Sequence, residues 1–324
     1  MYNSVSLGFT LWAIVFLIRG HDLIGAAFFT LALHYKQMSL YYALPFFCYL
    51  LGTCLKPPWF KSTHKFLNLS CVVIIGTCIC WLPFLRSFED TTAVMERLFP
   101  FSRGLYEDKV ANIWYISSVI IKWKSIFSTP TLVKMSTLLT ILAVLPSSIQ
   151  LLKNPSLHKF RLSLVNVSLA FFLFSFQVHE KSILLPAMPV LLLLEDYPLT
   201  SVWFAYMSTF SLVPLLAKDG LMIPFIALSG IFLLGALRAY EDLLLSFKNS
   251  AKYASLAFCI SISGSLLLVI GMFNVKQPAR YPHLHVLLNC IYSGIHFVGF
   301  LLYFNYLQFK EIPYNLYSKK IKYN

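Results

Sequence analysis

The chain has 324 residues, of which 58% are hydrophobic and only 12% are charged, and its mean hydropathy is +0.71. This composition excludes an ordinary soluble domain. A net charge of +13 would suit nucleic-acid binding in a soluble protein, but here the Lys and Arg residues lie in short segments between apolar runs. We therefore expect an all-α, polytopic membrane protein and no nucleic-acid partner.

The apolar runs approach or reach the roughly 20 residues that a helix needs to cross about 30 Å of hydrocarbon. They do not alternate as the strands of a membrane β-barrel do. Two or three segments precede residue 60, and the polar break at residues 34–37 (HYKQ) suggests a broken or re-entrant helix. In chain order, the expected apolar segments are 4–18, 22–34, 40–55, 66–85, 131–152, 162–178, 182–194, 199–217, 221–237, 254–273 and 284–307.

The positive-inside rule gives these segments an orientation. The loop at residues 56–65 carries three lysines and no acidic residue, which places it in the cytosol. If each later segment crosses the membrane, three more basic clusters fall on the same side. They are Lys153 with Lys159 and Arg161, then Arg238 with Lys248 and Lys252, and finally Lys310, Lys319, Lys320 and Lys322. Residues 86–112 and 179–181 then face the opposite, lumenal side together.

Two segments depart from this regular pattern. The segment 182–194 would reach only about 20 Å as a helix, so we expect it to borrow residues from its neighbours. Residues 113–128 contain Trp114, Trp123 and two lysines, and this pattern favours an interfacial helix over a crossing. We thus expect one membrane domain over residues 1–324, with a lumenal loop at 86–112, an interfacial helix at 113–128 and a cytosolic tail at 308–324.

Two polar stretches are candidates for a site. In the first, Arg103 and Lys109 could bind phosphate while Glu107 holds sugar hydroxyls, although a solvated amphipathic loop would have the same pattern. In the second, His179, Glu180 and Lys181 stand side by side between two apolar runs. A charge at the centre of a bilayer costs roughly 2.5–3.5 kcal/mol, so these residues lie at a wet edge or have partners. They either mark a short lumenal hairpin or hold a substrate that has one end in lipid.

Three stretches of the chain carry a resemblance to a known family. They are LALHYKQMSLYYALPFFCYLLG (31–52), RLFPFSRGLYEDKVANIW (97–114) and FFLFSFQVHEKSILLP (171–186). Over nearly its whole length the chain resembles the dolichyl-phosphate-glucose-dependent α-1,3-glucosyltransferases of the endoplasmic reticulum. The residues after Leu105 and before His179 are more similar to the members that add the first glucose to the N-glycan lipid precursor than to those that add the second.

The resemblance implies a glycosyltransferase of the C superfamily (GT-C) with about ten transmembrane helices in the endoplasmic-reticulum membrane. It implies an inverting transfer from dolichyl-phosphate-glucose to a mannose of the dolichol-linked oligosaccharide. Displacement needs a base for the incoming hydroxyl and positive or hydrogen-bonding groups for the departing phosphate. His179 is assigned to the donor phosphate, and Glu107 and Glu180 to the orientation of sugar or of neighbouring cations. Arg103, Lys109 and Lys181 are weaker phosphate candidates, and Lys36 and Gln37 are weaker still.

The chain also departs from this family. Family members are longer, and their catalytic base is an aspartate in a first lumenal loop that we expect to be missing here, so the chain is expected to be N-terminally truncated and its catalytic residue is unknown. Asp196 lies in EDYPLT, which is similar to the signature of that loop, but it follows the His179 motif on the cytosolic side and does not receive the role of base. No closely spaced His, Asp and Cys set indicates a metal, so we expect no cofactor.

Two other classes of function remain open. A polytopic transporter or flippase would distribute polar residues along several helices or show an internal repeat, whereas here the polar residues collect on one side. A non-catalytic fragment of the glucosyltransferase would at most bind the donor.

The tail residues Lys320 and Lys322 resemble a dilysine retrieval signal of the endoplasmic reticulum.

Overall fold

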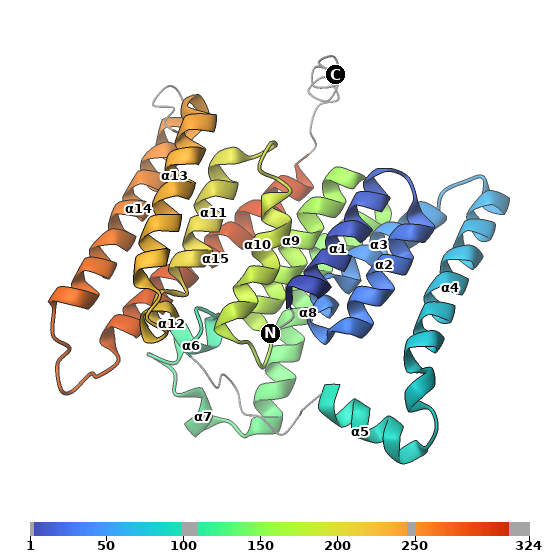
Figure 1. Cartoon of the computed structure of the whole chain (residues 1–324), viewed down its shortest axis with the longest axis horizontal. Helices are drawn as coiled ribbons and strands as arrows, with labels where there is room; N and C mark the ends of the chain where they lie inside the picture. The colour runs from blue at the N-terminus through green and yellow to red at the C-terminus, as the bar shows by residue number, and fades with distance from the viewer. Residues whose placement is uncertain (1–2, 99–108, 245–250, 311–324) are drawn as a thin grey trace.

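The computed structural model describes residues 3–98, 109–244 and 251–310, and within these ranges the chain is a bundle of helices without a β-strand (Figure 1). The expected all-α class is therefore confirmed. The helices are α1 (Asn3–Ile18), α2 (Asp22–Tyr35), α3 (Leu40–Cys54), α4 (Trp59–Trp81), α5 (Phe88–Leu98), α6 (Ile113–Ser117), α7 (Trp123–Ile126), α8 (Thr129–Lys153), α9 (Leu157–Phe174), α10 (Leu184–Leu191), α11 (Pro198–Phe210), α12 (Val213–Lys218), α13 (Met222–Leu244), α14 (Ala251–Asn274) and α15 (Leu284–Phe309). Short 3-10 turns occur at η1 (Gln37–Ser39), η2 (Leu82–Phe84) and η3 (Glu180–Ile183).

Six helices in the described ranges are long and apolar enough to cross a membrane, which confirms a multi-pass membrane protein. They are α4 continued by η2, α8, α9, α13, α14 and α15. The total of about ten crossings stays a prediction, because α1 and α2 are shorter apolar helices. α9 is the central helix, since 67% of its most apolar stretch is buried, whereas only 6% of the corresponding stretch of α4 is buried.

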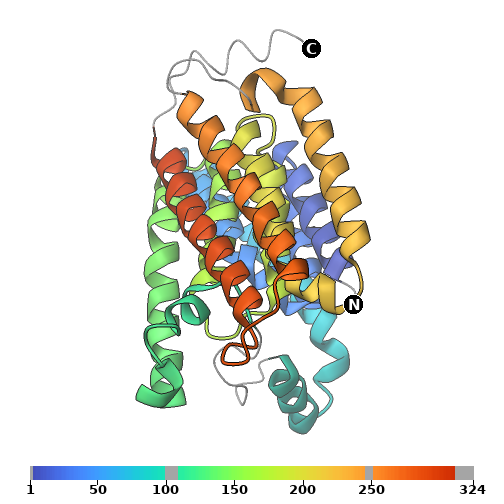
Figure 2. The same cartoon turned by 90° about the vertical axis from the view of Figure 1, so that its left-hand side faces the viewer.

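The segments that the charge pattern assigns to opposite sides of the membrane lie at opposite ends of the bundle. In Figure 1 the α8–α9 turn and the start of α4 lie at the upper end, whereas α5, α6, α7 and the α14–α15 connection lie at the lower end. Figure 2 shows the same separation from the side. The geometry is therefore compatible with the predicted orientation, in which the lower end faces the lumen.

Two of the expected segments have a different form in the structure, and the break expected at residues 34–37 is present. Residues 113–128 contain two short helices, α6 and α7, rather than one, and the β-branched run Val119–Ile120–Ile121 between them disfavours a continuous helix. Their position at the membrane interface stays a prediction. The segment 182–194 is η3 followed by α10, which ends at Leu191 and packs against α9 and α11. The polar break at residues 34–37 ends α2 and separates it from α3.

A network of buried polar side chains joins α8, α9 and α15. The amide oxygen of Gln308 lies 2.7 Å from Ser147 Oγ and accepts a 2.8 Å bond from Asn166 Nδ2. The amide nitrogen of Gln308 donates to the carbonyl oxygen of Ser147 and to Gln150 Oε1. Ser163 and Asn305 extend the network at 2.9 and 3.2 Å. Because hydrocarbon offers no hydrogen-bonding partners, these bonds fix the register of the three helices.

The network predicts a loss of stability when Gln308 is changed. Gln308→Leu keeps the size of the side chain but removes its bonds, and it leaves the amides of Gln150 and Asn166 short of partners. We expect the free energy of unfolding in detergent to fall by about 1–2 kcal/mol. Thr209→Val is the control, because the hydroxyl of exposed Thr209 donates to the carbonyl of Ala205 in its own helix. Equal thermal unfolding midpoints for the two variants would contradict the role given to Gln308.

Candidate active site

A cavity of about 620 Å³ lies at the lower end of the bundle, and four lysines and a histidine are among its lining residues. It draws residues from six separate parts of the chain, so no single sequence motif contains it. The lining residues are Asn3, Lys36, Met38, Lys109, His179, Glu180, Lys181, Ser182, Pro214, Leu215, Lys218 and Val286. We call it the cationic cavity, because four lysines and a histidine face a single carboxylate among these residues.

The turn that carries His179 is held in place from two sides. α9 ends at Phe174, and the chain is extended at Ser175 and again at His179, where φ is −90° and ψ is 152°. The carbonyl of His179 then accepts a 2.9 Å bond from the backbone N–H of Ser182, which opens η3. From α3, the hydroxyl of Tyr42 donates a 2.5 Å bond to the carbonyl of Leu185. His179, Glu180 and Lys181 thus lie in a short turn that is closed by a hydrogen bond and followed by a helix bonded to α3.

Lys109 reaches the cavity because the segment around it is fastened to α15 and α9. The thiol of Cys290 in α15 donates to the carbonyl of Lys109 at 3.3 Å. The indole N–H of Trp114 donates to the carbonyl of Phe174 at 2.8 Å. Gly294 provides the necessary space, since a Cβ there would lie 1.9 Å from Ile116 Cδ1 and 3.3 Å from the carbonyl oxygen of Ala111.

Lys36 and Lys218 complete the wall from distant parts of the sequence. Lys36 is the residue between α2 and η1, and its backbone is extended. Its ammonium group donates to the amide oxygen of Asn3. Lys218 is the last residue of α12, and Gly220 just after it has a φ of +70° that turns the chain toward α13. Lys218 is not among the residues predicted from the sequence. The available signal was a lysine at the lumenal end of the expected segment 199–217.

The structure brings together four of the six predicted site residues, namely Lys109, His179, Glu180 and Lys181. Arg103 and Glu107 lie outside the described residues. Gln37 lines a different, mainly apolar cavity beside α4 and α5. The cluster of lysines around one imidazole suits a phosphate group, because ammonium and imidazole donors make charge-assisted hydrogen bonds to phosphate oxygens.

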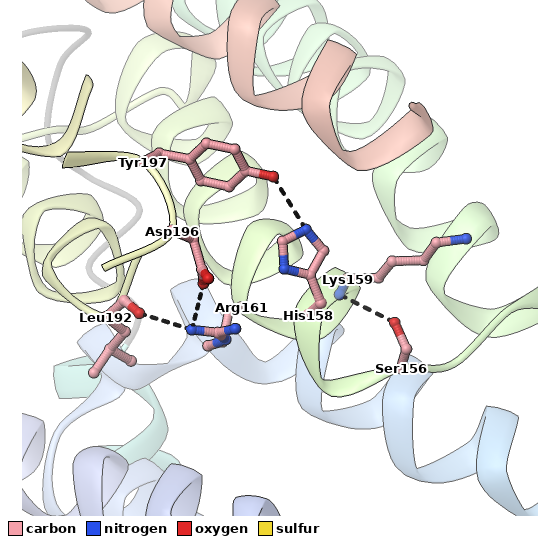
Figure 3. Close-up of polar contacts among 7 residues, drawn as sticks. All are labelled: Ser156, His158, Lys159, Arg161, Leu192, Asp196 and Tyr197. Atoms are coloured by element: carbon pink, nitrogen blue, oxygen red, sulfur yellow. Dashed lines mark hydrogen bonds and ion pairs between the residues drawn. The ribbon is translucent and has the colours of Figure 1, made fainter. Parts of the chain in front are cut away.

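Asp196 lies at the other end of the bundle, in the turn between α10 and α11 (Figure 3). Its carboxylate forms an ion pair with Arg161 at 2.9 Å, and the same guanidinium nitrogen donates to the carbonyl of Leu192 at 3.0 Å. The hydroxyl of Tyr197 lies 3.2 Å from His158 Nε2. These contacts attach the α10–α11 turn to the first residues of α9, at the end of the bundle opposite the cationic cavity.

Comparisons with known proteins agree over most of the chain. Residues 1–304 match the ALG6, ALG8 glycosyltransferase family. The chain is 42% identical to dolichyl pyrophosphate Man9GlcNAc2 alpha-1,3-glucosyltransferase of Gallus gallus, covering 99% of this chain and 67% of that protein. The protein of the same name from Rattus norvegicus is 43% identical, covering 94% and 64%. This chain therefore spans about two thirds of the length of these curated relatives.

The close contact at Gly294 predicts a rescue experiment. Gly294→Val should overpack the contact with Ile116 and push the segment carrying Lys109 away from α15, which costs about 1–3 kcal/mol of stability. Ile116→Ala in the same chain should restore most of the thermal unfolding midpoint. Gly271→Val is the control, since a Cβ at Gly271 meets no atom within 4 Å. Strictly additive effects of the two substitutions would show that this contact does not hold the segment.

Proposed function

Since this chain belongs to the ALG6, ALG8 glycosyltransferase family, we propose that it transfers glucose from dolichyl-phosphate-glucose to a terminal mannose of the dolichol-linked oligosaccharide. The bond formed is α-1,3, and the reaction takes place on the lumenal side of the endoplasmic-reticulum membrane. The names of the relatives support the α-1,3 transfer and the Man9GlcNAc2 acceptor. The observation that carries the proposal is the cationic cavity at one end of a membrane bundle.

The cationic cavity suits the phosphate that leaves the sugar during the reaction. When a mannose hydroxyl attacks the anomeric carbon, the bond from that carbon to the phosphate oxygen breaks and the phosphate gains negative charge. Fixed donors stabilise charge that develops in the transition state, because they need no reorganisation at the moment of reaction. We assign His179 to the phosphate oxygens, with Lys109 and Lys181 beside it. The lipid tail of the donor would leave the cavity toward the hydrocarbon.

Glu180 is the carboxylate among the described lining residues, and we assign it to orienting the neighbouring cations or the sugar. Arg103 and Glu107 remain proposed contributors from the loop that contains Lys109. We assign no residue of this chain as the base that deprotonates mannose. We propose that the transfer requires no metal ion. A chain that only binds the donor is the alternative, and the unaltered chain would then show no transfer in the assay below.

His179→Ala should lower glucose transfer by about 100-fold or more, because a donor to the developing phosphate charge is lost. The measurement is transfer from dolichyl-phosphate-glucose to lipid-linked Man9GlcNAc2 in microsomes that contain the protein. His283→Ala is the matched control, since His283 is exposed in the connection before α15 and does not line the cavity. Undiminished transfer by a folded His179→Ala chain would remove His179 from the site.

Lys218→Gln should raise the KM for dolichyl-phosphate-glucose by about tenfold, because one charged contact to the phosphate is lost. Lys218→Arg should retain most of the affinity, since it keeps the positive charge. Lys276→Gln is the control, because Lys276 is exposed at the same end of the bundle but does not line the cavity. If Lys218→Gln and Lys276→Gln have the same KM as the unaltered chain, Lys218 does not contact the donor.

A further inference from the structure

A second cavity, of about 830 Å³, lies between α11, α14 and α15. Figure 2 shows α14 and α15 side by side on the near face of the molecule, with α11 behind them. The cavity reaches the upper end of the bundle, opposite the cationic cavity, because its lining begins at the first residues of α11 and near the first residues of α14. The lining includes Tyr197, Trp203, Ala254, Ser261, His296 and Tyr303. We call it the upper cavity.

The walls of the upper cavity offer contacts to a hydrocarbon chain. The indole ring of Trp203 packs edge-on against the rings of His296 and Phe300. Three polar side chains of the wall, those of His296, Ser261 and Tyr292, are bonded within the protein, whereas the buried indole N–H of Trp203 has no hydrogen-bond partner among the described residues. His296 Nε2 lies 2.7 Å from Ser261 Oγ, and its Nδ1 lies 2.7 Å from the carbonyl of Tyr292. The hydroxyl of Tyr292 donates to the carbonyl of Ser261 at 2.9 Å. An occupant of these walls therefore gains by burying apolar surface.

The mouth of the upper cavity is cationic and aromatic. Lys252 lies two residues before Ala254 and is exposed, with its ammonium group 5.0 Å from the ring centre of Tyr253. Tyr306 follows Tyr303 by three residues, which places both on one face of α15, and Lys310 is the extended residue directly after the end of this helix. The ammonium group of Lys310 lies 5.6 Å from the ring centre of Tyr306. Tyrosines with adjacent lysines are typical of a helix end at a membrane surface.

One carboxylate near the mouth is already paired with a cation. Asp196, next to Tyr197, forms an ion pair with Arg161 (Figure 3). Lys252 and Lys310 are both exposed, so they offer positive charge to an anion at the membrane surface.

We propose that the upper cavity binds an acyl chain of an anionic glycerophospholipid, whose phosphate lies at the mouth near Lys252 and Lys310. The apolar walls select a hydrocarbon chain and the lysines select a negatively charged headgroup. A dolichyl phosphate held by its phosphate in the cationic cavity would place no anion at this opposite end. The inference does not rest on the proposed function, since the walls and the mouth of the upper cavity carry it.

Bromine on an acyl chain quenches tryptophan fluorescence at contact, so Trp203 reports on the occupant. The whole chain is reconstituted in phosphatidylcholine vesicles that contain a minor fraction of brominated phosphatidylserine or, separately, brominated phosphatidylcholine. The signal is the quenching lost in Trp203→Phe. We expect phosphatidylserine to quench on the order of tenfold more effectively at low mole fraction, given two lysines at the mouth. Equal quenching by the two lipids would overturn the proposal.

Two variants separate the walls from the mouth. A Cβ at Gly299, which lines the upper cavity, meets no atom within 4 Å, so Gly299→Leu should fill the cavity without a clash and abolish the preferential quenching. Gly235→Leu on α13 is the control, because Gly235 has the same free space but lies outside the cavity. Lys252→Gln with Lys310→Gln should remove the preference for phosphatidylserine.

Three outcomes would overturn the proposal. One is preferential quenching in Gly299→Leu at the level of Gly235→Leu, with both variants unfolding at similar temperatures. The second is an unchanged lipid preference after both lysine substitutions. The third is displacement of brominated phosphatidylserine by dolichyl phosphate at a lower mole fraction than by unlabelled phosphatidylserine, which would identify a polyprenyl occupant instead.

Discussion

The absence of hydrogen-bonding partners in hydrocarbon is the constraint on which this structure depends. It makes the Gln308 network energetically important, because the amides buried between α8, α9 and α15 find their partners within the bundle. These three helices then determine the position of everything at the lower end. α9 delivers the His179 turn, and α15 holds the Lys109 segment through Cys290 and the space at Gly294. A change of register in the network would therefore separate the two halves of the cationic cavity.

Much of the fold could be predicted from the sequence, because long apolar runs have few alternatives in a membrane. The expected segments 131–152, 254–273 and 284–307 correspond to α8, α14 and α15 within a few residues. His179, Glu180 and Lys181 could also be found from the sequence. Charges that interrupt apolar runs are energetically costly in a membrane unless they face water or have partners, so they indicate a functional site. Their proximity to Lys109 followed from the alternation of crossings, which places both stretches at the same end.

The rest depended on contacts between distant segments. Lys218 carries no local signal, because a lysine at the end of an apolar helix is common, and only the fold brings it to His179. α10 ends at Leu191 and packs against α9 and α11, so it need not satisfy the length rule of an isolated crossing. α6 and α7 divide a stretch whose tryptophans and lysines indicated one helix, since composition does not reveal where a helix stops.

The length of α4 has a mechanical consequence. With η2 it extends over 26 residues, and only 6% of its most apolar stretch is covered by protein. At 1.5 Å per residue this rod measures about 39 Å, which exceeds a hydrocarbon thickness of about 30 Å. A helix longer than the hydrocarbon thickness is accommodated by tilting, kinking or local thickening of the bilayer. α2 and α3 pack against α4 and limit how far it can tilt, and α5 follows it in the chain, so any tilt of α4 also displaces α5.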